Sequence, residues 1–398
     1  STFYENIYRL PPGHKMTASM KGIEITEYWK PVPGAELPHL SDEEYAEGFL
    51  EVFTKSVAAR LRAPPGTACS MLSGGIDSGS VTAAARDILA SRGAPPLPTY
   101  SAMRTGVADC AETRAIQAAI SMPSIAPNLI DLKAISDVTG PLITKNEEPY
   151  DAEMAMIQCI YRAAQDDGNR VVLDGMSGDV VLAEGSYIVR LIRSGRMATA
   201  MKEIMAENHF WGDEKRVRRL FRYGRAALVP EGVRKKLTEF RRDSRVKEAV
   251  SSSLISANLA DQIDIAGRIE LMQQNLARQS KADYVVERCE MIRPSVTAGR
   301  ERYSRAAAAF GTEARDPFLD KRVVDYCLSL PGRLLLRDGW PKFILRDAMA
   351  CKLPDEVRWQ RGKPHLGWLF NRAVTKSAID RGEISLDHLQ KCLQDYVD

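Results

Sequence analysis

Several features are scarce in this chain. The seven cysteines among 398 residues are scattered, odd in number and contain no C-x-x-C pair. We therefore expect reduced thiols, and neither a disulfide framework nor a zinc site. The five histidines are dispersed too, which argues against a His/Cys metal cluster. No apolar run is long enough to cross a bilayer, and the N-terminal stretch STFYENIYRL lacks the basic start and apolar middle of a signal peptide. These absences predict a cytoplasmic protein without a membrane partner.

The charge balance is unremarkable as well. The net charge is +3, with 27% charged and 44% hydrophobic residues. This composition supports a large core, and the length suggests two domains. It does not indicate a nucleic-acid-binding arm or an acidic tail.

The first 39 residues are expected to form a hairpin and a linker. Residues 6–29 alternate in the manner of two strands around a turn at Lys21-Gly22, and these strands need an apolar partner that the segment does not contain. A capping box from Ser41 to Glu44 then predicts a helix that runs towards Arg62.

Residues 40–190 alternate between strands and helices. The predicted strands are TACSML (67–72), LPTYSAM (97–103), SIAPNLIDL (124–132) and RVVLDG (170–175). Such alternation predicts an α/β fold, a parallel sheet with helices on both faces. After about Tyr187 the pattern favours almost only helix, so residues 191–398 are expected to form a helical portion that packs on the sheet and completes the site.

The loop SMLSGGIDSGS (70–80) follows the first predicted strand of that sheet. Ligands of open parallel sheets lie beyond the carboxyl ends of strands, where helices begin. Gly74 and Gly75 allow a tight turn close to an anion, while Ser73 and Ser78 offer hydroxyl groups. The negative charge of Asp77 makes it a poor direct ligand of phosphate, but its carboxylate could bind a phosphate-bound Mg²⁺. The spacing is not that of the common G-x-x-x-x-G-K-[ST] loop, and a plain turn with a helix cap is the alternative interpretation.

Five stretches of the sequence resemble motifs of known protein families. S-G-G-I-D-S resembles the pyrophosphate-binding loop of the ATP-pyrophosphatase superfamily, whose members cleave ATP between the α- and β-phosphates. Four further stretches resemble asparagine synthetases in the same order: RLPPGHKM with EYW (9–29), LDGMSGDVVLAEG (173–185), EARDPFLDKRVVDYCLSLP (313–331), and DGWPKFILRDAM with LPDEVRWQRGKPHLG (338–367). The chain is identified as an asparagine-synthetase-like domain of the ATP-pyrophosphatase fold type.

The resemblance implies a reaction and a set of residues. ATP and a carboxylate would give an acyl-adenylate and pyrophosphate, and an amine would capture the adenylate as an amide. The matching positions are, for the pyrophosphate loop, Ser73, Gly74, Gly75, Asp77 and Ser78; for Mg²⁺, Asp77 and Asp179; for adenosine, Leu72, Met103 and Gly175; and for a catalytic lysine on the phosphates, Lys363. Read without the family, Asp179 is a helix cap, Leu72 and Met103 are core, and Lys363 is a solvated residue. Arg315 is expected to pair with a buried acid, and Asp320 to cap a helix.

Two departures bear on the substrate. The chain starts at the family's linker, so a glutaminase-like partner is expected as a separate chain, or else the sequence is a processed or truncated piece. Met176 stands where asparagine synthetases carry a glutamate proposed to accept the proton of ammonia, and Val180 replaces the next acid. A methionine suits a bulkier acceptor, and the chain is most similar to the macrolactam synthetases that close lasso peptides. We therefore expect a precursor peptide as substrate, with Glu147, Glu148, Tyr150 and Asp151 as possible proton acceptors.

Other functions remain open. Free asparagine synthesis is the main alternative, and an RNA-modifying ATP pyrophosphatase or a non-catalytic scaffold are alternatives from other classes. Residues 215–247 hold thirteen basic and three acidic residues, which fits a solvated helix face or a docking surface for an acidic peptide, a partner protein or RNA.

Overall fold

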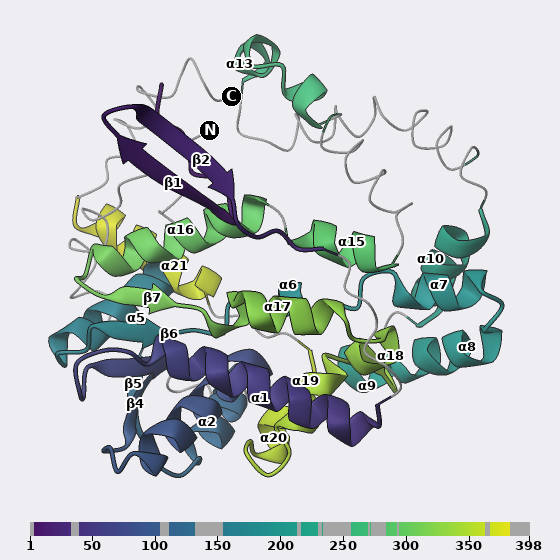
Figure 1. The fold of residues 1–398 in the computed structure, drawn as a ribbon, viewed down its shortest axis with the longest axis horizontal. Coiled ribbons are helices and arrows are strands. Elements are labelled where there is room, and N and C mark those ends of the chain that lie inside the picture. Colours follow the sequence, from purple (N-terminus) through teal and green to yellow (C-terminus); the bar gives the residue numbers. More distant parts are fainter. Residues whose placement is uncertain are drawn as a thin grey trace.

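The computed structural model describes residues 4–32, 40–103, 111–131, 154–212, 216–229, 233, 256–269, 271, 284–292, 294–362 and 367–382. At its centre is a five-stranded sheet in the order β5-β4-β3-β6-β7 (Figure 1). The strands are β3 (Ala68–Met71), β4 (Leu97–Met103), β5 (Ile125–Asp131), β6 (Val171–Leu173) and β7 (Glu313–Arg315), and all neighbouring pairs are parallel. The predicted α/β fold with a parallel sheet is confirmed.

Helices cover both faces of this sheet. One face carries α1 (Asp42–Arg60), α2 (Ile76–Ser91), α17 (Lys321–Leu328) and α19 (Phe343–Ala348), and Figure 1 shows α1 beside α17. The other face carries α5 (Ala155–Asp166), α16 (Pro294–Ala308) and α21 (Gly367–Asp380). In β6 the side chains of Val171 and Leu173 enter the first core and that of Val172 enters the second, because successive residues of a strand point to opposite faces. The predicted capping box of α1 is present, with Ser41 and Glu44 bonded to each other's backbone.

The remaining helices surround this framework. They are α3 (Ala111–Ile120), α6 (Gly178–Val181), α7 (Tyr187–Arg193), α8 (Met197–Ala206), α9 (Asn208–Trp211), α10 (Arg216–Leu228), α13 (Ala257–Gln262), α15 (Tyr284–Met291), α18 (Gly332–Leu335), α20 (Asp355–Arg358) and a 3-10 turn at Pro317–Leu319. Helices α7, α8 and α10 share a small core of their own around Leu191 and Ile204. No helix in the described ranges combines the length and the apolar character that a membrane crossing requires.

The expectation of almost pure helix after about Tyr187 was wrong in two places. β7 pairs with β6 as an edge strand of the sheet, and β8 (Leu336–Arg337) pairs with β9 (Trp340–Pro341). Strands of two or three residues are too short to show a period of two in the sequence, and they form because a partner strand lies beside them. The division at residue 190 stays a prediction, although the sheet takes its fifth strand from the later part.

The predicted N-terminal hairpin is confirmed as β1 (His14–Ser19) and β2 (Gly22–Glu27). Its register pairs Met16 with Ile25 and Ala18 with Ile23, which gathers the apolar side chains on one face. Met16, Ile23 and Ile25 are each more than half exposed. Figure 1 shows the hairpin away from the central sheet.

Candidate active site

The site lies where the strand order of the sheet reverses. The chain continues from β3 to β4 on one side, whereas β6 lies on the other side of β3. At such a switch point the loops after the two strands diverge and leave a crevice at their carboxyl ends. Here these are the first loop, residues 72–75, which leads into α2, and the second loop, residues 174–177, which leads into α6.

Hydrogen bonds fix the shape of the first loop. The Ser73 N–H donates to Ser78 Oγ at 3.1 Å, the two serine hydroxyls lie 2.9 Å apart, and the Ser78 hydroxyl donates to the Gly75 carbonyl at 3.2 Å. Gly75 is the N-cap of α2, and no side chain caps that helix. The positive end of a sixteen-residue helix is therefore available to an anion.

One glycine in each loop is packed too closely against a neighbouring helix to carry a side chain. Gly74 has a φ of +77°, and a Cβ there would lie 2.6 Å from the Ala115 backbone carbon. A Cβ on Gly175 would lie 2.5 Å from the backbone nitrogen of Ser78. Any other residue would push the first loop away from α3 at position 74, or the second loop away from the start of α2 at position 175. The site is thus built at the junction of the two loops.

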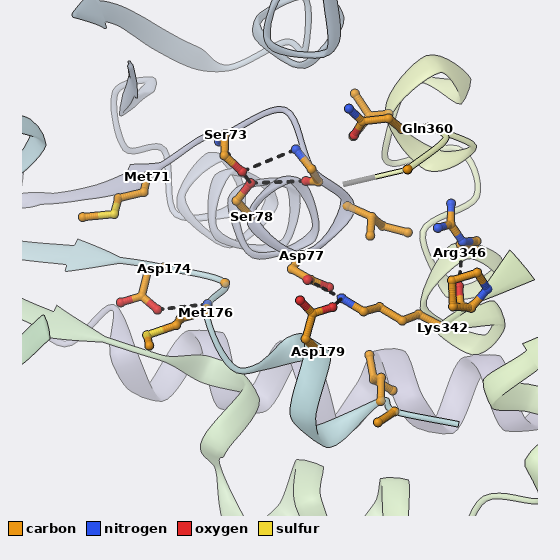
Figure 2. Close-up of a pocket in the computed structure, with 18 of the residues that line it drawn as sticks. Met71, Ser73, Asp77, Ser78, Asp174, Met176, Asp179, Lys342, Arg346 and Gln360 are labelled. Atoms are coloured by element: carbon orange, nitrogen blue, oxygen red, sulfur yellow. Dashed lines mark hydrogen bonds and ion pairs between the residues drawn. The ribbon is translucent and has the colours of Figure 1, made fainter. Parts of the chain in front are cut away.

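Lys342 connects the two acids at this junction (Figure 2). Its Nζ donates to Asp77 Oδ2 and lies 2.6 Å from Asp179 Oδ1, and its side chain is only 8% exposed. Burial lowers the pKa of Lys342, but the charges of Asp77 and Asp179 outweigh this, so the pKa is raised overall. Lys342 is the N-cap of α19, and its backbone is in the left-handed region with a φ of 57°. The chain therefore turns sharply at this residue, between β9 and α19.

The acid pair fits a magnesium ion. Asp77 and Asp179 already share one cation, the Lys342 ammonium. Within the described ranges no cluster of three or more His, Cys, Asp or Glu residues could hold a metal. Magnesium is commonly bound by one or two carboxylates, with phosphate oxygens and waters completing its shell. Two carboxylates beside a phosphate loop match that pattern.

A cavity of about 420 Å³ opens over both loops. Its phosphate end is polar and is formed by Ser73, Gly75, Asp77, Ser78, Asp179, Lys342 and Arg346. Its walls are largely apolar and include Met71, Met156, Ile157, Met176, Leu182, Phe210, Trp211 and Tyr303. The volume suits a ligand of nucleotide size.

The second loop is held from below by a buried ion pair. Arg300 Nη1 lies 2.9 and 2.8 Å from the two carboxylate oxygens of Asp174, which is almost fully buried. The same nitrogen is 3.6 Å from the Met176 sulfur, and the Met176 N–H donates to Asp174 at 3.1 Å. Burial raises the pKa of Asp174 and Arg300 opposes that rise. Met176 thus presents a thioether to the cavity, and the carboxylate of Asp174 beside it is paired with Arg300.

Most of the predicted phosphate residues meet here. Ser73, Gly75, Asp77, Ser78, Asp179 and Gly175 line the cavity, and Gly74 shapes the turn. The Leu72 side chain lies in the core, and Met103 is 7% exposed at the end of β4. Neither lines the cavity, so their contact with adenosine stays a prediction.

The sequence reasoning missed Lys342. It stands in the stretch DGWPKFILRDAM, which resembles the family, yet Lys363 was expected as the catalytic lysine. The sequence did contain a signal for Lys342. This lysine directly precedes the apolar run FIL, and a lysine next to a buried apolar segment is a candidate for a buried cation. Lys363 lies outside the described residues, as do Glu147, Glu148, Tyr150 and Asp151.

Two structural expectations had different outcomes. Asp320 caps α17, as predicted, through the Arg322 N–H. The expected pairing of Arg315 with a buried acid was wrong. Arg315 pairs with Glu313, whose side chain is 63% exposed, and donates to the carbonyls of Arg60 and Arg62. Those carbonyls end α1 and need donors, and Arg315 supplies them from β7.

The basic stretch is described only in part. Residues 216–229 and 233 are described, and α10 accounts for most of them. Arg218, Arg222 and Arg225 are exposed, in keeping with a solvated face, whereas Arg219 is buried and lies 3.3 Å from Glu207.

Comparison with known proteins agrees with this geometry. The family model described as asparagine synthase matches residues 48–380. Asparagine synthetase [glutamine-hydrolyzing] 3 of Bacillus subtilis is 22% identical over 375 residues, which cover 91% of this chain and 54% of that protein. The asparagine synthetases [glutamine-hydrolyzing] of Gallus gallus and Rattus norvegicus are each 42% identical over 62 residues, which cover 15% of this chain and 11% of each relative. The chain thus spans about half the length of the Bacillus relative. It belongs to the asparagine synthase family, whose members are ATP-dependent ligases that form carbon–nitrogen bonds.

Proposed function

We propose that the chain is an AMP-forming amide synthetase that activates an Asp or Glu side chain of a precursor peptide and joins it to the N-terminal amine of the same peptide. The observation that carries this proposal is the contrast at the second loop. Asp179 keeps its place beside Asp77 and Lys342, while Met176 faces the cavity without a proton-accepting group.

In the first step a carboxylate oxygen attacks the α-phosphorus of ATP. The bond from that phosphorus to the bridging oxygen breaks, and pyrophosphate leaves with the electron pair. The N-terminus of α2 and the Lys342 ammonium stabilise the charge that develops on the leaving group. Magnesium held by Asp77 and Asp179 would supply further neutralisation of the phosphate oxygens.

In the second step the uncharged amine attacks the acyl carbon, the bond from that carbon to the AMP phosphate oxygen breaks, AMP leaves with the electron pair, and the amine nitrogen releases its proton to solvent. Ammonia is a weakly held acceptor that benefits from a positioned base. An amine in the same peptide reaches the adenylate at a high effective concentration, so it depends less on such a base. Met176 and the neighbouring Tyr303 offer apolar surface to a peptide instead.

Asparagine synthesis from aspartate is the second candidate, and the names of the relatives favour it. Under that alternative the free amino acid would be adenylated and ammonia would be the acceptor. The cavity wall at Met176 gives that reaction no help with the proton.

The partners that we propose are ATP, a precursor peptide and other biosynthetic proteins, in the cytoplasm. The exposed apolar face of the β1–β2 hairpin supports a protein partner of this kind.

Exchange of labelled pyrophosphate into ATP tests the proposal. The chain with Mg²⁺ is given free aspartate, acidic peptides with a free N-terminus, or the same peptides with an acetylated N-terminus. We expect exchange with both kinds of peptide, net AMP release only with the free N-terminus, and no response to aspartate. Exchange driven by aspartate alone would contradict the peptide proposal in favour of asparagine synthesis, and no exchange with any of them would contradict adenylation itself.

A further inference from the structure

Arg346 lies one helical turn after Lys342 and also lines the cavity. Only 2% of the residue is exposed. Its Nε donates to the Pro341 carbonyl at 2.8 Å, and its Nη1 donates to the Arg358 carbonyl. These two bonds fix the plane of the guanidinium at the cavity margin (Figure 2).

Three aromatic rings surround this guanidinium. Its central carbon lies 4.9 Å from the ring centroid of Trp340, 5.6 Å from that of Phe210 and 5.8 Å from that of Trp359. Aromatic faces stabilise a cation without neutralising its charge. Among the described residues no carboxylate forms an ion pair with Arg346, in contrast to Arg300, which is paired with Asp174.

The charge persists at neutral pH. Burial lowers the pKa of Arg346 to about 10, and the negative charge of Asp77 works against that shift. Arg346 is therefore a cation that belongs to the cavity lining, and no carboxylate among the described residues is paired with it.

The charges of the phosphate end explain what such a cation can do. Asp77 and Asp179 contribute two negative charges, and Lys342 and Arg346 contribute two positive charges. Once the acids hold a divalent cation, the lysine and arginine charges both remain for a phosphate chain. A fixed guanidinium then serves best, because it needs no reorganisation during the reaction.

We propose that Arg346 is a pyrophosphate-binding residue, whose caged guanidinium contacts the terminal phosphates of ATP and the leaving pyrophosphate. This inference rests on the proposed adenylation, since pyrophosphate is a product only of that cleavage. Arg288 gives the contrasting case. It too is buried and bonded to carbonyls, of Val181 and Cys327, but it does not line the cavity, so we assign it no contact with a ligand there.

A purely structural role would make Arg346 a clamp between residues 341 and 358. Two neutral variants of different character separate the roles. Arg346→Met places an apolar chain in the aromatic cage, and Arg346→Gln keeps amide donors. Arg346→Lys keeps the charge and loses the planar fork. Arg193→Gln is the matched control, because the exposed Arg193 side chain also donates to a backbone carbonyl, that of Ala226, and does not line the cavity.

Calorimetric titration of the full chain with magnesium pyrophosphate, and separately with AMP, provides the test. We expect both neutral variants to weaken pyrophosphate binding by about tenfold or more, as loss of a charged hydrogen-bonding group should. AMP binding should change by less than about twofold, and Arg346→Lys should stay within about threefold of the unaltered chain. Thermal unfolding shows which variants are folded, and either neutral variant suffices.

The outcomes separate the two proposals. Equal pyrophosphate affinity in a folded neutral variant and the unaltered chain overturns the role of Arg346 and leaves adenylation standing. Parallel losses for pyrophosphate and AMP also overturn it, since they indicate a clamp. If the unaltered chain binds no magnesium pyrophosphate at all, both the role of Arg346 and the proposed function are contradicted.

Discussion

The two ends of the cavity differ in where their charged groups lie. At the phosphate end, acids, a lysine, an arginine and a helix N-terminus meet within a rigid frame of hydrogen bonds. At the second-loop end, the charged groups Asp174 and Arg300 bind each other below the surface, and Met176 covers them. The residues of the phosphate end therefore support the proposed activation of a carboxylate by ATP, whereas the proposed acceptor is supported by the apolar surface at Met176.

The largest effect is expected at the phosphate end. Asp77→Asn keeps the size of the side chain and removes the charge that pairs with Lys342 and that we propose binds Mg²⁺. We expect AMP formation with acidic peptides to fall by about a thousandfold or more, a loss of roughly 4 kcal/mol of transition-state stabilisation. Assays of AMP release check this. Asp355→Asn, at an exposed acid, is the control, and full activity in Asp77→Asn would remove the site assignment.

Lys342→Met sharpens the comparison because two opposite changes are expected. Loss of a fixed cation beside the phosphates should lower pyrophosphate exchange by about a hundredfold or more. Without the ammonium competing for Asp77 and Asp179, binding of Mn²⁺ in the absence of nucleotide should tighten by about threefold or more. Calorimetry with Mn²⁺ alone measures the second change. Weaker metal binding in the variant would show that the lysine does not compete with the metal.

Met176→Glu should have a small effect at the other end. The Arg300 guanidinium lies at the sulfur of Met176, so a carboxylate there would pair with Arg300 and would not accept a proton readily. We expect asparagine output from aspartate and ammonia to rise by less than about threefold. Quantification of asparagine beside a Met176→Leu control tests this. A rise of orders of magnitude would return the chain to asparagine synthesis.

The smallest expected effect concerns the charges beneath the second loop. Burial and the nearby charge of Asp174 raise the pKa of Asp316 to about 6, and Asp316 accepts a hydrogen bond from Ser177. Between about pH 4 and 6 the Asp316 carboxyl is therefore still protonated in the folded chain but already ionised in the unfolded chain. The stability contributed by Asp316 declines as the pH rises through this range, because the folded state binds the extra proton. Asp316→Asn lacks this decline and should gain stability relative to the unaltered chain between pH 4 and 7. Urea unfolding across that range measures the gain, and parallel curves would contradict it.

Much of the fold was predictable because it follows from local signals. The capping box at Ser41, the turn at Lys21-Gly22 and the short apolar strands were confirmed by the structure. β7 was missed because a three-residue edge strand depends on its neighbour and carries no period of its own.

The candidate site divided in the same way. Ser73, Asp77 and Asp179 could be predicted because each belongs to a short motif at a strand end. Lys342 and Arg346 lie more than 260 residues beyond Asp77 in the chain, and tertiary packing, including that of α19 against α1, brings them to the site. The three aromatic rings around Arg346 come from three separate segments, α9, β9 and the end of α20, so no local sequence pattern could predict this cage.

The most direct test of the central claim is the mass of a peptide after reaction. The chain is incubated with ATP, Mg²⁺ and a panel of acidic peptides with free N-termini, and the products are analysed by mass spectrometry with fragmentation. The account predicts a product lighter by one water, formed together with AMP, in which the N-terminal amine is joined to an Asp or Glu side chain. Unchanged peptides together with conversion of free aspartate to asparagine would contradict it.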